Sequence, residues 1–156
     1  MTSRTKPADA NDADSGADPS LRQGPAQALA QALAAELTRV VEAYRRMPHS
    51  KFGLRLEPHG DRAQAGYWLA TQFTLLAQGM ENWDSPKAPR WRELPVLGAF
   101  ALGDQIAVVG NDLLAAFQAL KDPREALVWT PGGGRVPAEK AMAAMLDSTT
   151  ALRKAL

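Results

Sequence analysis

The segment 100–121, FALGDQIAVVGNDLLAAFQALK, decides the fold class. Its apolar residues recur every three or four positions, which predicts one face of an α-helix: Leu102, Ile106, Val109, Leu113, Ala116 and Leu120. The opposite side is also largely apolar, with Ala107, Val108, Leu114, Ala115 and Ala119, and leaves a narrow polar strip of Asp104, Asn111 and Gln118. A helix that is apolar nearly all round is expected to be buried. We therefore expect this helix at the centre of the core.

Two glycines interrupt this helical segment on one side. Gly103 and Gly110 lie seven residues apart, and each costs about 1 kcal/mol of helix propensity relative to alanine. Close approach of a neighbouring backbone is the physical reason to keep them.

Three further helices follow from the same spacing. One runs from about Pro25 to Met47, where proline suits the first turn because its missing N–H costs nothing there. The next begins near Asp61, a fair N-cap. We expect its apolar face to hold Gln72 in the middle and Phe73 at the edge. The last runs from Pro137 to residue 156. Together they predict an all-α, four-helix bundle-like single domain.

Composition agrees with this class and excludes others. The chain has 156 residues, a net charge of +1, no cysteine and 46% hydrophobic residues. This length suits one domain. The lack of cysteine excludes disulfide scaffolds, thiolate metal sites and cysteine nucleophiles. Residues 1–20 contain almost no large apolar side chain, so we expect a disordered tail there and a bundle domain over 21–156.

Long proline- and glycine-rich connectors join the predicted helices. They cover residues 48–60, 83–98 and 128–136. In the last one, the PGGG turn is compatible with a small β-hairpin near 127–136 or with an irregular loop. We expect any functional surface to be built from these connectors.

No recognisable catalytic or metal-binding set is present in the sequence. Both histidines, His49 and His59, fall in a connector and belong to no metal-ligand motif. No serine occurs in a nucleophile elbow, and the PGGGR segment lacks the spacing of a phosphate-binding loop. We therefore predict no metal and no cofactor.

The loop 128–134, VWTPGGG, together with the number of helices, resembles the DinB-like group, which includes thiol-dependent isomerases and transferases. The resemblance covers only that loop and the helix count, and it implies a compact helical bundle. That group places three histidines on its helices for a divalent metal. The predicted helices of this chain carry no histidine, so the resemblance implies a bundle without that metal chemistry.

These observations lead to three functional hypotheses. The first is a non-enzymatic adaptor that binds a protein partner, or itself, because tryptophan and arginine are enriched at interface hot spots. Its candidate contact residues are Trp83, Arg90, Trp91, Arg92, Trp129 and Arg135. The alternative is a small-ligand-binding or transferase-type bundle with a pocket near Asp112, Tyr44 and Gln72. In it, Asp112 is expected to be partly buried, with Arg39, Arg62 or Arg92 as its partner.

The third hypothesis is weak nucleic-acid binding by a basic face over residues 39–62. The near-neutral net charge makes nucleic acid an unlikely partner. No stretch reads as a signal peptide or a transmembrane helix. We therefore expect a cytoplasmic protein without membrane contact.

Overall fold

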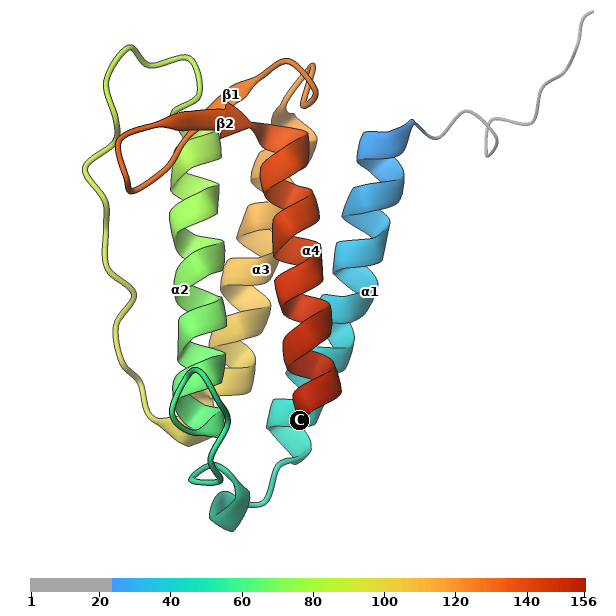
Figure 1. Cartoon of the computed structure of the whole chain (residues 1–156), viewed down its shortest axis with the longest axis vertical. Coiled ribbons are helices and arrows are strands. Elements are labelled where there is room, and N and C mark those ends of the chain that lie inside the picture. The colour runs from blue at the N-terminus through green and yellow to red at the C-terminus, as the bar shows by residue number, and fades with distance from the viewer. Residues whose placement is uncertain (1–23) are drawn as a thin grey trace, which may run out of the picture.

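Four long helices run down, up, up and down along one common direction (Figure 1). The computed structural model describes residues 24–156, so the predicted tail over 1–20 and the domain boundary beside it lie outside the described residues. The helices are α1 (Pro25–Arg46), α2 (Arg62–Glu81), α3 (Leu102–Ala119) and α4 (Ala138–Ala155). Short 3-10 helices, η2 (His49–Lys51) and η3 (Ala99–Ala101), precede α2 and α3. The predicted all-α class is confirmed.

Helices α2 and α3 are neighbours that point the same way, which determines the length of the connector between them. Helix α2 has 20 residues, and a helix of that length spans about 30 Å. The chain must return over that distance before α3 can begin. Residues 82–98 make this return along the outside of the bundle (Figure 1). At about 3.3 Å per residue, an extended segment of this length is long enough.

Local sequence signals set the start of the first two helices. Pro25 occupies the first turn of α1. Asp61 caps α2 by accepting a hydrogen bond from the Gln64 backbone N–H at 2.8 Å, and Gln64 Oε1 accepts one from the Asp61 backbone N–H at 3.0 Å. This reciprocal pair is a capping box.

The core face of α2 is centred differently from the prediction. Phe73, expected at the edge, is fully buried, whereas Gln72, expected in the middle, is only partly buried. The contacts explain the shift, because α2 packs mainly on α3 and less on α4. Phe73 lies with Leu69 and Met80 in the core formed there.

Helix α3 is not the central buried helix that its composition predicts. It packs against α1 and α2, and its outer side remains exposed, with Val108 61% accessible. By length and composition alone, the span Ala99–Ala119 is long and apolar enough to cross a membrane, but half of it is buried in the bundle. The core helix of a soluble protein passes the same test.

The two glycines of α3 do permit close packing against α1. A Cβ on Gly103 would lie 3.4 Å from the Val41 carbonyl oxygen and 2.9 Å from Arg45 Cγ. A Cβ on Gly110 would lie 2.5 Å from Leu37 Cδ1. The predicted approach of a neighbouring backbone is thus confirmed at Gly103, whereas at Gly110 the neighbour is a side chain.

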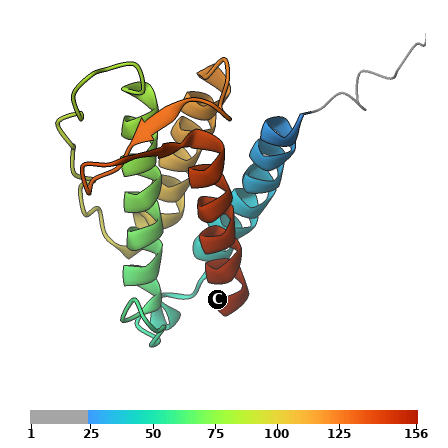
Figure 2. The same cartoon turned by 45° about the horizontal axis from the view of Figure 1, so that its top comes forward.

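A short hairpin covers the end of α2 (Figure 2). Strands β1 (Leu127–Trp129) and β2 (Arg135–Pro137) pair antiparallel, with Val128 opposite Val136. Of the two alternatives for 127–136, the hairpin is therefore correct. Its backbone lies on Gly79 of α2, where an added Cβ would be only 2.1 Å from the Trp129 carbonyl oxygen.

One carboxylate joins α1 to α4. Glu36 is buried on α1, pairs with Arg39 at 2.9 Å and accepts a hydrogen bond from Arg153 Nε of α4. The hydrogen bond from Arg153 is the largest influence, and it holds the pKa of Glu36 below its ordinary value of 4.5. Among the described ion pairs, the one between Glu36 and Arg153 directly links α1 to α4.

The Gly79→Ala substitution tests the seat of the hairpin. Alanine favours a helix by about 1 kcal/mol, but the overlap with a backbone oxygen requires movement that costs about 1–3 kcal/mol or more. We expect a lower free energy of unfolding in urea, by about 1 kcal/mol or more. Gly132→Ala, where no atom lies within 4 Å of the new Cβ, is the matched control and should change little. A more stable Gly79→Ala protein would contradict this packing.

Glu36→Gln should make unfolding less dependent on acid pH. Because folding lowers the pKa of Glu36, its ionised form stabilises the fold above pH 4.5, and this contribution is lost as the pH falls through the folded pKa. We expect the variant to lose about 1–3 kcal/mol at pH 7 and much less near pH 3, measured by urea unfolding. Glu42→Gln is the control, since that exposed carboxylate is 4.0 Å from Arg46 Nη2 and should contribute little.

Candidate functional site

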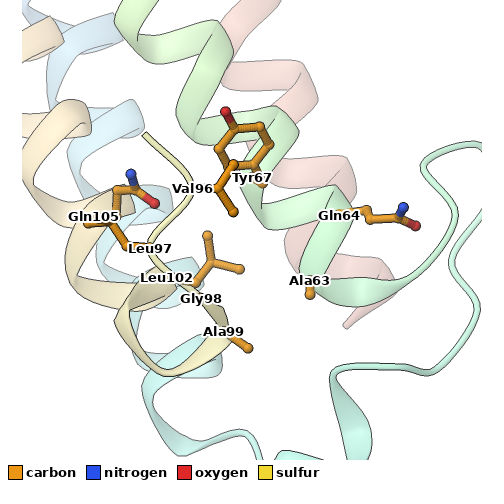
Figure 3. Close-up of a pocket in the computed structure, with 9 residues that line it drawn as sticks. All are labelled: Ala63, Gln64, Tyr67, Val96, Leu97, Gly98, Ala99, Leu102 and Gln105. Carbon is orange, nitrogen blue, oxygen red and sulfur yellow. The ribbon is translucent and has the colours of Figure 1, made fainter. Parts of the chain in front are cut away.

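A cavity of about 230 Å³ opens between the first turns of α2 and α3, beside the end of the long connector. Its wall combines helical side chains with residues 96–99 of the connector (Figure 3). The lining residues are Ala63, Gln64, Tyr67, Val96, Leu97, Gly98, Ala99, Leu102 and Gln105. Most of them are apolar, and none carries an ionisable acid or base that titrates near neutral pH.

Two hydrogen bonds attach the connector wall to the helices. Tyr67 Oη of α2 donates to the Leu94 carbonyl oxygen at 2.6 Å. Gln105 Nε2 of α3 donates to the Pro95 carbonyl oxygen at 2.7 Å. Side chains from two different helices therefore determine where the following residues, Val96 and Leu97, lie.

A third anchor holds the connector further up α2. Gln78 is buried, and its carboxamide makes two hydrogen bonds with the backbone of Arg92. Its Nε2 donates to the Arg92 carbonyl oxygen at 3.1 Å, and its Oε1 accepts from the Arg92 N–H at 2.7 Å. Side chains of α2 and α3 thus bind the connector at Arg92, Leu94 and Pro95, and the connector itself forms no helix or strand.

Apolar side chains are exposed where the connector reaches the cavity. Val96 is 77% accessible and Leu97 is 60% accessible. Phe100, next along the chain, is 80% accessible and stacks on the His49 ring with 5.0 Å between ring centres. Clustered exposed apolar side chains are typical of places where a ligand or partner binds.

Gln105 contributes the main polar atom of the cavity. The residue is buried, with only 8% of its surface exposed. Among the hydrogen bonds of the described residues, its side chain takes part in one, through Nε2. Figure 3 shows its carboxamide directed across the cavity, with the oxygen on the side of Val96. The Gln64 side chain is used in the capping box and points away from the cavity.

The three residues predicted to form a pocket are not brought together. Tyr44 is buried on α1, donates its hydroxyl to the Arg62 carbonyl oxygen at 2.6 Å, and has a pKa raised by burial. Gln72 lies on α2, partly buried. Asp112 is exposed on α3, so the expectation that it is partly buried with an arginine partner is wrong. None of the three lines the cavity.

Two of the predicted partner-contact residues hold the connector in place. Trp129 Nε1 donates to the Ser85 carbonyl oxygen at 3.1 Å, and Arg135 donates to the same oxygen. The Arg135 guanidinium lies 3.9 Å from the centre of the Trp129 ring, as a cation–π pair.

The other four partner-contact candidates lie along the same connector. Trp83 and Arg90 are exposed, Trp91 is half-buried, and the backbone of Arg92 is bound to Gln78. A contact of these residues with a protein partner or a second copy stays a prediction.

The basic face over 39–62 is largely neutralised within the protein. Arg39 pairs with Glu36, Arg55 with Glu57, and Arg45 Nη2 lies 2.7 Å from Asp104 Oδ1. Nucleic-acid binding by this face stays a prediction, with few cations left for phosphates.

The residues that form the cavity were not singled out by sequence reasoning. Tyr67 and Gln105 were candidates for no role, although Gln105 interrupts an apolar helix beside Ile106. That polar position in an apolar segment was the available signal, together with the apolar run that follows Pro95. Neither signal reveals which carbonyl group the side chain binds.

The donor set does not fit a three-histidine metal centre. His49 lies in η2 and His59 in the loop before α2, where its ring centre lies 4.4 Å from that of Trp68 with the ring planes tilted by 35°. Over residues 24–156, no group of three or more His, Cys, Asp or Glu side chains is placed to hold a metal ion. No step of metal chemistry is therefore derived for this chain.

Comparisons with known proteins found one fold relative. No protein-family model and no curated protein matches the chain. The structure is similar to that of a histidine-to-alanine mutant of mycothiol-dependent maleylpyruvate isomerase, with a TM-score of 0.70 and 16% identity. The match covers 85% of this chain and 61% of the isomerase chain.

This likeness overturns the main functional hypothesis. We expected a non-enzymatic adaptor, but a solved structure that shares this fold is that of an enzyme. The finding agrees better with the alternative, a small-ligand-binding or transferase-type bundle. At 16% identity the likeness shows the fold alone, so the chemistry must be argued from this chain's own residues.

Proposed function

We propose that this protein is a small-molecule-binding helical bundle that takes an apolar ligand into the cavity between α2, α3 and residues 96–99. The observation that carries the proposal is the pair of exposed apolar side chains, Val96 and Leu97, held at the cavity by anchored backbone. Burying an exposed valine or leucine side chain completely is worth about 1.5–3 kcal/mol. A ligand that covers both residues gains much of its affinity from that burial.

The size and lining of the cavity support a small ligand. Its volume of about 230 Å³ is below the 300–1,000 Å³ of sites for drug-sized molecules. An apolar lining with a few placed polar groups is the usual composition of such sites. The fold likeness to an enzyme that acts on a small molecule is in keeping with this assignment.

The proposal is limited to binding and does not include a chemical step. The polar side chains of the lining are those of Gln64, Tyr67 and Gln105, and two of them are used to hold the backbone. A transferase would need a second substrate or a reacting group in the cavity.

We also propose that the protein is cytoplasmic, which is supported by the packing of the most apolar helix, α3, against α1 and α2.

The test uses matched variants of two exposed valines. Val96→Asp places a charge at the cavity, whereas Val108→Asp places one on the outer face of α3, away from the cavity. With 2-methoxynaphthalene as the ligand, ¹⁵N–¹H NMR titration should move the amide signals of residues around Gly98 and Gln105. We expect Val96→Asp to weaken binding about tenfold or more, because the ligand must then desolvate a carboxylate.

Val108→Asp should bind the ligand as the original chain does. The proposal fails if the original chain shows no saturable shift at the cavity. It also fails if both variants weaken binding equally, since the effect would then be one of charge or stability and not of the site.

A further inference from the structure

We infer that the cavity selects neutral ligands that carry one hydrogen-bond donor beside an apolar body, such as a phenol, over carboxylates and over ligands without a donor. This selectivity rests on the proposed function and adds the chemical class of the ligand to it. It follows from the side-chain oxygen of Gln105, which no hydrogen bond of the described residues uses, and from the lack of charged side chains among the lining residues.

The free polar atom is an acceptor. Gln105 Nε2 donates to the Pro95 carbonyl oxygen at 2.7 Å, and this bond assigns the nitrogen end of the carboxamide. The other end is therefore the oxygen, and no hydrogen bond of the described residues uses it. The residue is only 8% exposed, but no buried side-chain oxygen among the described residues lacks a partner, so this oxygen keeps some accessible surface through which a ligand donor can reach it.

The remaining polar side chains of the lining do not offer a donor to the ligand. Tyr67 has one hydroxyl proton, and it is donated to the Leu94 carbonyl oxygen. Figure 3 shows the Tyr67 ring against the cavity, with its hydroxyl directed away. Gln64 also points away, toward the loop before α2.

The side chains of the lining disfavour an anionic ligand. No Lys, Arg or His side chain is among its residues, so a carboxylate would lose hydration without gaining a cation. It would also meet the carboxamide oxygen of Gln105, an acceptor facing an acceptor. A neutral hydroxyl or N–H group meets the same oxygen as a donor, and its apolar body contacts Val96 and Leu97.

The experiment compares three ligands with one ring system. These are 2-naphthol, which has a donor, 2-methoxynaphthalene, which has none, and 2-naphthoate, which is an anion at pH 7. Dissociation constants come from NMR titration of the complete chain. We expect 2-naphthol to bind about 3- to 10-fold more tightly than 2-methoxynaphthalene, as one hydrogen bond allows. 2-Naphthoate should bind most weakly of the three.

Two variants separate the acceptor from the anchoring of the connector. Gln105→Met removes the carboxamide with little change in volume, and the ratio of the 2-naphthol and 2-methoxynaphthalene affinities should fall to about one. Tyr67→Phe removes the other connector hydrogen bond and leaves Gln105 in place. It should lower both affinities together and keep the ratio, which a merely structural role of Gln105 would not predict.

The outcomes distinguish the ligand selectivity of the cavity from its binding function. If 2-methoxynaphthalene or 2-naphthoate binds as tightly as 2-naphthol, or if Gln105→Met keeps the preference, the selectivity is wrong and the binding function stands. If none of the three ligands binds at the cavity, the binding function is wrong and the selectivity falls with it.

Discussion

The parallel arrangement of α2 and α3 is the constraint on which the rest of this structure depends. It requires a connector that travels the length of the bundle, and that connector forms no regular structure. Its backbone groups therefore need partners from elsewhere. The helices supply them through Gln78, Tyr67 and Gln105, which bind the connector at Arg92, Leu94 and Pro95. In this bundle, polar side chains of α2 and α3 therefore bind the backbone of the connector.

The cavity is a direct product of that constraint. Beyond Pro95, the anchored connector turns toward η3 with apolar residues that are not packed into the core. Val96 and Leu97 are exposed and lie outside the core that contains Leu69 and Phe73. The proposed binding site is thus formed where the backbone must return to the start of α3, and in it one carboxamide would serve both as an anchor and as an acceptor.

The sequence predicted the helices well because their signals are local. Apolar spacing, the proline at the start of α1 and the Asp61 cap all act within a few residues. The burial of α3 was overestimated, since composition does not tell which neighbours cover a helix. The predicted pocket failed for the same reason. Tyr44, Gln72 and Asp112 lie on three helices, and whether their side chains meet depends on how those helices pack, which periodicity does not contain.

The ion pair between Glu36 and Arg153 has a consequence for how the chain folds. These two residues are 117 positions apart, and α1 packs mainly on α3 and α4, while Tyr44 near its end contacts the start of α2. The apolar face of α1 is therefore made early in synthesis, covered in part when α3 has emerged and completely only when α4 follows. Contacts of such long sequence separation slow folding and leave an apolar surface open meanwhile. Of the described helices, α1 is separated from its main packing partners by the longest stretch of chain.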